Sequence, residues 1–447
     1  MTSRKRPNDS SSSSHAKETS GPKRKISKKI SSSVNSLSVT KKFTEFKVEN
    51  VVKCLYKYQL GSLKQNERGR ISEQVITEKL RRFYVYARED SVDFDRRITA
   101  LQFHPKDPHI LGIGSKSGQL TIRFLNKPTA ALTWNGIGPG GSITYITFDP
   151  LVSNSVLISS IDGTVRRHNY VENTSKEFLN TDSFSKWYCS VNASRDHGLI
   201  VTGDTSGTMT ILNKDLKIVS LHKVQKGKIN SLEIPKGRDW LLASASLDKT
   251  VKIWDIRKIE SKKPIYTLSH DHAVNSANFS QVDGNRLLTT DQSKELRVYK
   301  APLFDLETSI THPHRQFQHM TPIKATWHPL SDLIVVGRYP DPSLEDYVEG
   351  EARTVDIISA ETGLMRLQLD SVSCGGILNL NVFNANGEIL ASTMSRNINY
   401  WKARDLIERI KKPYDDDDGD PKEVKLPISK PPKQSKTKNV REKTKRV

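Results

Sequence analysis

Cysteine is scarce in this 447-residue chain, which has only Cys54, Cys189 and Cys374, far apart and without a CxxC pair. This spacing excludes a disulfide framework and a cysteine zinc site, and it is typical of a protein in a reducing compartment. The sequence also lacks any run of about 18 apolar residues, so we expect no transmembrane helix and no membrane partner. No apolar core follows the basic, Ser-rich N-terminus, which argues against a secretory signal.

Catalytic motifs are missing as well: there is no P-loop, no GxSxG and no HExxH. Four histidines come close together, His312, His314, His319 and His328, but their spacings match no standard zinc pattern and no cysteine accompanies them. We therefore predict that the protein is not an enzyme and that it uses no metal and no cofactor.

Positive charge is present in excess, with a formal net charge of +20. Residues 1–42 carry +9, residues 421–447 carry +8, and five aspartates between positions 415 and 420 separate the second basic segment from the rest of the chain. Such charge runs are typical of disordered tails. The clusters SRKRP and PKRKISKK in the first tail are typical of nuclear import signals, so we predict a nuclear protein.

One layout recurs seven times between the tails: an apolar strand, a turn, and two further strands separated by a Ser/Asp/Gly turn. The copies begin near Ile98, Ile143, Trp187, Ile229, Val274, Ile323 and Ile377. Their spacing of 42 to 54 residues is close to that of four-stranded propeller blades. A single blade cannot bury its own faces, so the copies must stack into a closed ring. We predict an all-β fold, a seven-bladed WD-repeat β-propeller over residues 91–405.

A helical pattern precedes these repeats. Apolar residues recur at helical spacing in two segments, at Val48, Val51, Val52, Leu55 and Tyr58, and at Ile71, Val75, Ile76, Leu80, Phe83 and Tyr84. The pattern predicts a helix–loop–helix over residues 43–90, between the disordered tail at 1–42 and the propeller; residues 406–447 form the second tail. The apolar stripes either pack on this chain's own propeller or fill a groove of a second propeller protein.

Basic residues recur near the ends of the predicted strands. They are Arg96, Arg97, Lys116, Lys226, Lys228, Arg315 and Arg338. If their loops share one face of the ring, these side chains form a collar of phosphate-binding groups around the central channel, and nucleic-acid affinity should fall steeply with salt. Taken singly, each of them is better explained as a solvated surface charge, and the interpretation rests on their recurrence at corresponding blade positions.

The loop HPHRQFQHMTPIK, residues 312–324, places Phe317, Gln318 and His319 in a row within a basic turn. An apolar ring inserted into the minor groove unstacks a base step at a cost of roughly a few kcal/mol. That cost is smallest where bases are damaged or mispaired, so such a wedge detects weak stacking. Gln318 and His319 would fill the gap and hydrogen-bond the bases left behind. The alternative is that Phe317 packs into its own blade.

These residues resemble the family of the small WD-repeat subunit of the UV-damaged-DNA-binding protein, the substrate receptor of a cullin–RING ubiquitin ligase. The resemblance covers roughly residues 45–405. The matching stretches are FDRR (94–97), GSKSG (114–118), GGSIT (140–144), VTGD (201–204), TVKIWDIR (250–257), RLLTTDQ (286–292), HPHRQFQHMTPIKATWHP (312–329) and LIVVGRYPDP (333–342).

The resemblance implies a role in DNA binding for the loops. Phe317, Gln318 and His319 would be the hairpin inserted at a photolesion, and the two damaged pyrimidines would enter a shallow pocket lined by Tyr339. The residues that would hold DNA phosphates are Arg96, Lys116, Lys228 and Arg315. We add Arg338 to this set, because it is one of the basic residues near the strand ends.

The resemblance also implies a protein partner, the large adaptor subunit of the ligase. Asp255 and Arg257 of the WDIR sequence would contact this adaptor, together with apolar residues of the helical hairpin, Val51, Leu55, Val75, Leu80 and Phe83. The predicted protein is a nuclear, non-catalytic receptor that binds UV-damaged double-stranded DNA in chromatin and initiates nucleotide excision repair. The alternative is a chromatin-associated WD-repeat scaffold that binds histones or other proteins.

Overall fold

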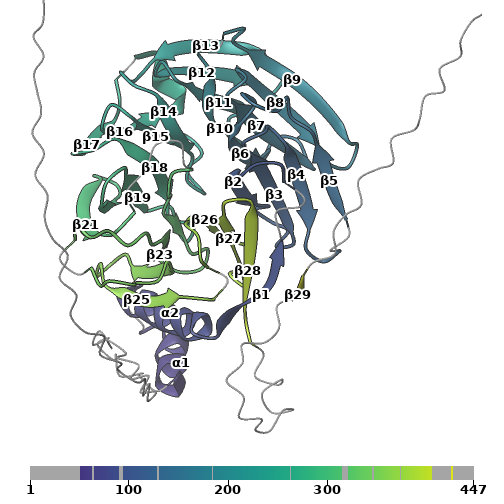
Figure 1. Ribbon diagram of the computed structural model, residues 1–447. Coiled ribbons are helices and arrows are strands. Elements are labelled where there is room, and N and C mark those ends of the chain that lie inside the picture. Colours follow the sequence, from purple (N-terminus) through teal and green to yellow (C-terminus); the bar gives the residue numbers. More distant parts are fainter. Residues whose placement is uncertain are drawn as a thin grey trace, which may run out of the picture. The chain divides into compact units, whose positions relative to one another are not determined.

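The computed structural model describes residues 51–62, 65–89, 94–127, 130–183, 185–261, 263–314, 321–344, 347–372, 374–404 and 424–425. These residues form seven mainly antiparallel sheets arranged around a common axis, with two α-helices beside them (Figure 1). The predicted seven-bladed propeller, preceded by a helical hairpin, is confirmed.

Each of the first six sheets is a meander of four strands in chain order. The first blade consists of β2 (Ile98–Phe103), β3 (Ile110–Ser115), β4 (Leu120–Phe124) and β5 (Ala131–Trp134). The second consists of β6 (Ile143–Phe148), β7 (Ser155–Ser160), β8 (Thr164–Asn169) and β9 (Thr174–Asn180). The third consists of β10 (Tyr188–Ser194), β11 (Leu199–Asp204), β12 (Thr208–Asn213) and β13 (Ile218–Lys223).

The next three blades repeat this arrangement, with a short 3-10 helix, η1 (Ile256–Ser261), inserted in the fourth. The fourth blade consists of β14 (Ile229–Glu233), β15 (Leu241–Ser246), β16 (Thr250–Asp255) and β17 (Tyr266–Ser269). The fifth consists of β18 (Val274–Phe279), β19 (Arg286–Asp291), β20 (Glu295–Lys300) and β21 (Asp305–Thr311). The sixth consists of β22 (Thr326–Trp327), β23 (Leu333–Gly337), β24 (Val355–Ser359) and β25 (Met365–Leu369).

The seventh blade combines both ends of the described chain. Its sheet order is β26 (Leu378–Phe383), β27 (Ile389–Met394), β28 (Asn397–Ala403), β1 (Phe83–Glu89) and β29 (Val424–Lys425). β1 runs antiparallel to β28, and β29 pairs with β1 in parallel. The ring is therefore closed by a strand that comes from before the first repeat.

The predicted boundary at residue 91 and the predicted helical role of Phe83 and Tyr84 are wrong, because these residues belong to β1. Helix α2 ends at Leu80. The following sequence, FYVYARE, alternates partly exposed and buried side chains from Tyr84 to Glu89, which is the period-2 pattern of a strand. Aromatic and β-branched residues favour this conformation.

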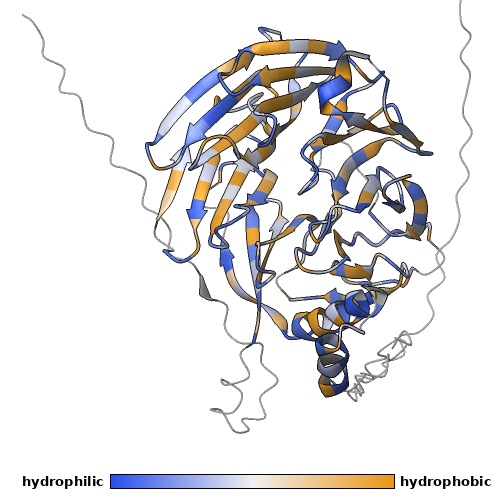
Figure 2. Ribbon diagram, turned by 180° about the vertical axis from the view of Figure 1, so that it is seen from behind, coloured by the Kyte–Doolittle hydropathy of each residue, from blue (hydrophilic) through white to orange (hydrophobic). Residues whose placement is uncertain are grey.

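Packing between blades holds the ring together. The first strands of neighbouring blades contact one another, and β26 contacts β2 to complete the circle. Hydrophobic residues recur along the strands (orange in Figure 2). Their side chains pack between adjacent sheets, as where Leu288 of β19 and Ile334 of β23 share one buried cluster. Polar groups add bonds between blades: the Thr99 hydroxyl donates to the Ile143 carbonyl at 2.7 Å.

Strand direction sorts the loops onto two faces. Because neighbouring strands of a blade are antiparallel, the loops that enter each first strand and the loops that join second to third strands lie at one end of the ring. We call this end the upper face; it includes residues 94–97, 116–119 and 225–228. The other end, the lower face, includes residues 104–109 and 328–332.

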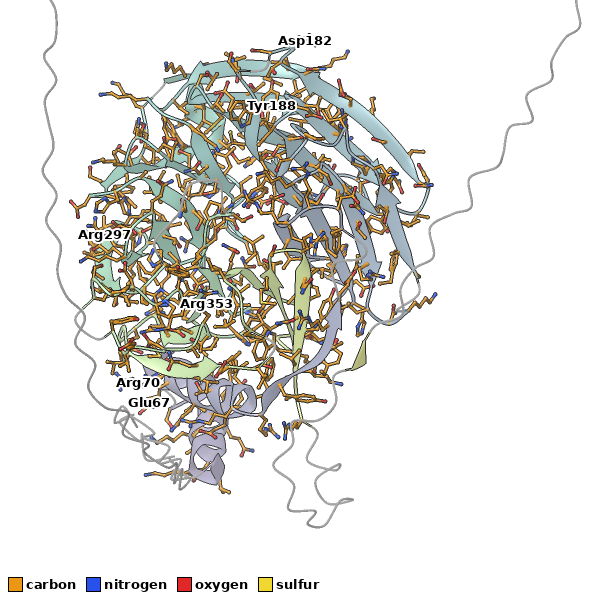
Figure 3. All side chains as sticks on the ribbon, viewed as in Figure 1. Glu67, Arg70, Asp182, Tyr188, Arg297 and Arg353 are labelled. Carbon is orange, nitrogen blue, oxygen red and sulfur yellow. The ribbon has the colours of Figure 1, made fainter. Side chains whose placement is uncertain are left out.

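Helix α2 (Gln65–Leu80) lies against the lower face. Helix α1 (Val51–Gln59) precedes α2, which carries Arg70 (labelled in Figure 3). The Arg70 guanidinium pairs at 3.0 Å with Glu361, which is in a lower-face loop. Leu80 is buried in the core of the sixth and seventh blades. Within the described residues, neither helix combines the length and apolar character that a membrane crossing requires.

Candidate nucleic-acid interface

Three cations gather on the upper face of the first blade. Arg96 and Arg97 immediately precede β2, and Lys116 follows β3; the backbone N–H of Lys116 donates to the Arg97 carbonyl at 2.8 Å. The charge of Arg97, burial and then the charge of Arg96 lower the pKa of Lys116. Arg96 is exposed and Lys116 partly exposed. These like charges repel one another, so an anion such as a phosphate would relieve the repulsion.

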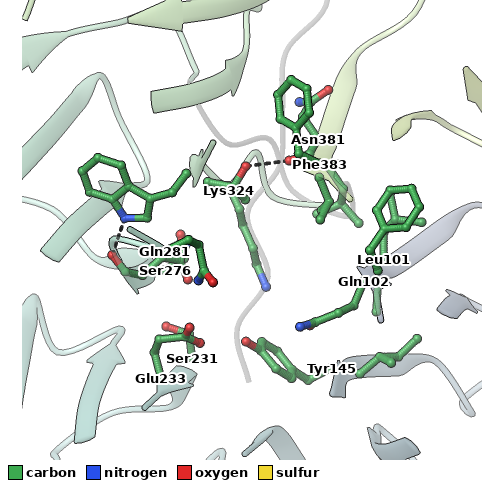
Figure 4. A pocket seen from close by; sticks show the side chains of 18 of the residues that line it. Leu101, Gln102, Tyr145, Ser231, Glu233, Ser276, Gln281, Lys324, Asn381 and Phe383 are labelled. Carbon is green, nitrogen blue, oxygen red and sulfur yellow. Dashed lines mark hydrogen bonds between the residues drawn. The ribbon is translucent and has the colours of Figure 1, made fainter. Parts of the chain in front are cut away.

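A second pair of cations lies where the channel meets the upper face. Lys228 precedes β14, and Lys324 lies just before β22. Burial, together with the charge of Lys228, lowers the pKa of Lys324 to about 8. The side chain of Lys324 projects into the central channel, and its Nζ lies 5.6 Å from the centre of the Tyr145 ring (Figure 4). The cations of the fourth and sixth blades are thus close enough to influence each other.

The channel below these lysines is a cavity of about 210 Å³, lined by the first strands of several blades. Glu233 of β14 hydrogen-bonds to Tyr145 of β6 in this cavity (Figure 4). Burial raises the pKa of Glu233 to about 8, although the charge of Lys236 opposes the shift. The channel therefore holds a carboxyl group that stays protonated at neutral pH.

An upper-face pocket of about 490 Å³ has Tyr339 in its wall. The pocket is formed by the connection between β23 and β24, and the guanidinium of Arg353 lies 5.3 Å from the centre of the Tyr339 ring. The backbone N–H of Tyr339 donates to the carbonyl of Pro313 at 2.9 Å. Tyr339 is therefore next to the segment that leads into the predicted wedge.

The predicted wedge residues, Phe317, Gln318 and His319, lie outside the described residues, as does Arg315. The chain on either side of them is on the upper face: His314 precedes them, and the hydroxyl of Thr321 donates to the Ile98 carbonyl at 3.0 Å at the start of β2. The role of the wedge residues stays a prediction.

The prediction that Arg338 contacts phosphate is wrong for this structure. Arg338 is only 2% exposed, and its guanidinium pairs with Asp356 at 3.1 Å and with Glu351 at 2.7 Å. Because both carboxylates already neutralise it inside the protein, this side chain is not available to a phosphate at the surface. The remaining described members of the predicted phosphate set, Arg96, Lys116 and Lys228, do share the upper face.

The residues predicted to contact an adaptor lie toward the lower face. Asp255 ends β16, and Arg257 follows it in η1. The Arg257 guanidinium donates to both oxygens of Asp255, each at 2.8 Å, and lies 5.3 Å from the centre of the Trp240 ring. This bidentate pair holds the arginine against an aromatic ring at the edge of the fourth blade.

The helical residues of that set divide into exposed and buried groups. Val75 is 61% exposed, as a docking residue should be. Leu80 is 1% exposed, so it faces its own propeller and the prediction that it contacts a partner is wrong. Phe83, in β1, is partly buried and packs against Phe383 with ring centres 6.1 Å apart, and its contact with a partner stays a prediction. The side chains of Val51 and Leu55 lie outside the described part of the chain.

Comparison with known proteins gives the family. Residues 214–255 match the model of the WD domain, G-beta repeat. DNA damage-binding protein 2 of Bos taurus is 40% identical over 80% of this chain and 83% of its own length, and that of Mus musculus is 41% identical over 79% and 81%. The Danio rerio protein of the same name is 35% identical over 92% of this chain and 82% of its own.

The chain belongs to the DNA damage-binding protein 2 family. The family resemblance seen in the sequence is thereby confirmed. In this family member, the stretches that carried the resemblance occupy both faces of the ring: FDRR, GSKSG and GRYPDP lie on or next to the upper face, and TVKIWDIR runs to the lower face.

Sequence reasoning did not select Lys324 or Arg353 as site residues of this DNA damage-binding protein 2 family member. Lys324 follows Ile323 at the start of the sixth blade, where the other blades carry Thr99, Thr144, Cys189, Asn230, Asn275 and Asn379. Aligning the seven repeats would have shown this single lysine. Nothing in the local pattern indicates that Arg353 stacks on Tyr339, because an irregular loop separates them.

Proposed function

We propose that this protein senses damaged double-stranded DNA with its upper face and binds the large adaptor subunit of a cullin–RING ubiquitin ligase with its lower face, in the chromatin of the nucleus. Its curated relatives are named for binding damaged DNA. The observation that carries the proposal is the gathering of Arg96, Lys116 and Lys228 on the face that also holds the Tyr339 pocket.

The upper face supplies two kinds of contact. The cations hold backbone phosphates without reading sequence, which gives a general affinity for duplex DNA. Phe317 inserts at a step that is already poorly stacked, Gln318 and His319 occupy the gap, and Tyr339 lines the pocket that receives the displaced bases. Damage preference therefore comes from the wedge, and general affinity comes from the cations.

The lower face serves the ligase. Exposed apolar residues on the helical hairpin, such as Val52, Tyr56 and Val75, form a surface that a groove in the adaptor would cover. Asp255 and Arg257 offer a preformed polar contact at another lower-face edge. The protein acts as a receptor without chemistry of its own, and both partners bind at once because they use opposite faces.

The test compares affinity for a UV-irradiated duplex with affinity for the same duplex before irradiation. Phe317→Ala should weaken binding to the damaged duplex by about tenfold, in line with a stacking contact of about 1–3 kcal/mol, and change binding to the undamaged duplex little. His319→Ala should act in the same direction. Equal losses on both duplexes would contradict the wedge.

Lys116→Ala tests the cations in the same assay. It should weaken binding to both duplexes alike and make the dependence of log affinity on log salt concentration shallower by about one unit. Lys106→Ala is the matched control, because Lys106 is an exposed lysine of the same blade on the lower face. Deleting residues 1–42 and 421–447 then separates the sensor from a scaffold: a sensor keeps its damage preference, and a scaffold with incidental tail affinity loses all DNA binding.

A further inference from the structure

The segment that leads into the wedge is anchored by two buried histidines. His312 and His314 are 1% and 0% exposed, and their rings stack with centres 5.4 Å apart. Nε2 of His312 lies 3.3 Å from Asp356 of β24, and Nε2 of His314 lies 3.2 Å from Asp291 of β19. The fifth and sixth blades thus each hold one histidine, and the position of the chain is fixed up to His314.

Asp356 connects this anchor to Arg338. Its carboxylate is fully buried and accepts hydrogen bonds from Arg338 at 3.1 Å and from the Thr354 hydroxyl at 2.6 Å. Arg338 in turn pairs with Glu351 at 2.7 Å. A continuous chain of polar contacts therefore runs from His312 through Asp356 and Arg338 to Glu351.

Glu351 belongs to the connection that forms the Tyr339 pocket. The two ends of the polar chain are therefore the anchor of the wedge segment and the wall of the pocket. A backbone bond, from Tyr339 N–H to the Pro313 carbonyl, joins the same two segments at 2.9 Å. The segment that ends at His314 and the pocket loop are far apart in sequence, yet they share one buried support.

Stability alone does not explain this arrangement. Burying an arginine with two carboxylates costs desolvation that their attraction often fails to offset, so apolar residues would serve a core equally well. Burial also lowers the pKa of His312 to about 4, so this ring is neutral at physiological pH and leaves Arg338 as the cation that balances Asp356. A directional network of this kind fixes geometry, which an apolar contact does less well.

We propose that Arg338 and Glu351 are positioning residues for damage recognition: they hold the pocket loop in register with the wedge segment, so that a base displaced by the wedge meets the Tyr339 pocket. This inference rests on the proposed function. Neither residue touches DNA. They affect the preference for damaged over undamaged duplex because preference needs both loops in place, whereas general affinity comes from cations elsewhere on the face.

Glu351→Ala is the informative variant. It frees the pocket loop, while Arg338 keeps its 3.1 Å contact with Asp356, so the propeller should still fold. The expected result is a loss of about tenfold in the ratio of damaged to undamaged duplex affinity, as for the loss of one charged contact, with affinity for undamaged duplex unchanged. Glu349→Ala is the matched control, because Glu349 is an exposed residue of the same loop.

A double variant separates positioning from general damage to the fold. In a Phe317→Ala background, Glu351→Ala should cause no further loss of preference, because the wedge that it serves is gone. If Glu351→Ala behaves like Glu349→Ala while Phe317→Ala lowers preference, the positioning role is refuted and the proposed function stands. If Phe317→Ala leaves preference unchanged, the wedge and the inference fall together. A fall in thermal midpoint with equal losses on both duplexes would show that Glu351 only supports the fold.

Discussion

Glu233 and Lys324 both face the central channel, and burial moves the pKa of each to about 8 from opposite directions. Arg338 shows the same dependence on surroundings, since two carboxylates make it part of the interior while Arg96 is exposed on the same face. At the scale of the residue, the type of side chain determines which charge it can carry. Its burial determines whether it carries that charge at a given pH and whether a ligand can reach it.

Glu233→Gln tests this reasoning through pH. The folded protein holds the Glu233 proton up to about pH 8, whereas the unfolded chain releases it near the ordinary value of 4.5. The unfolded state therefore binds fewer protons between these values, and stability falls as pH rises through that window. Glutamine stays neutral, so the variant should gain thermal midpoint over the natural protein as pH rises from 5 to about 8.5. A difference that is the same at both pH values would contradict the raised pKa.

Single charged residues were the hardest feature to place from sequence. The basic collar was inferred from residues near strand ends, and Arg96, Lys116 and Lys228 do share one face because strand direction is set by the repeat. Arg338 also sits at a strand end, but its partners Glu351 and Asp356 come after an irregular connection. Periodicity carries no information about such a contact.

At the scale of the element, local patterns were sufficient wherever a strand belonged to a repeat. The predicted starts at Ile98, Ile143, Ile229 and Val274 are the first residues of β2, β6, β14 and β18. β1 was missed because its partner β28 lies at the other end of the propeller, and its aromatic residues also satisfied a helical spacing. The aromatic and β-branched residues of this segment favour a strand, but the local sequence gives no sign of the distant strand with which it pairs.

A pair of substitutions on α2 separates the two ways in which its apolar residues are used. Val75→Asp should abolish binding to the proposed adaptor and change the free energy of unfolding by no more than about 0.5 kcal/mol, because Val75 is exposed. Leu80→Ala should cost about 2–5 kcal/mol of stability, because Leu80 is buried in the propeller core. Denaturant unfolding and a direct binding assay with purified adaptor measure both.

The opposite result would contradict the assignment of Val75 to partner binding and of Leu80 to the propeller core. If Val75→Asp keeps its affinity for the adaptor, the exposed surface of α2 is not the docking site. If Leu80→Ala remains folded but loses the adaptor, then Leu80 is in reach of the partner despite its burial in this structure.

At the scale of the whole molecule, the propeller separates two surfaces. Arg96, Lys116, Lys228 and the Tyr339 pocket lie on the upper face, while α2 packs against the lower face. This separation follows from the alternation of strand direction, repeated seven times around the axis. The separation depends on a closed ring, because an open array of blades would leave the apolar faces of its end blades exposed.

The contact between the seventh blade and the first tests whether side-chain interactions are needed to close the ring. Glu89 of β1 is 3% exposed, accepts a hydrogen bond from the Tyr400 hydroxyl at 2.8 Å and pairs with Arg123 of β4, so it joins the last blade to the first. Glu89→Ala leaves the buried Arg123 without this carboxylate and should cost about 3–5 kcal/mol in denaturant unfolding. Glu388→Ala, which removes a surface pair with Lys79 at 3.9 Å, should cost at most about 1 kcal/mol. Equal effects of the two substitutions would mean that strand pairing alone closes the ring.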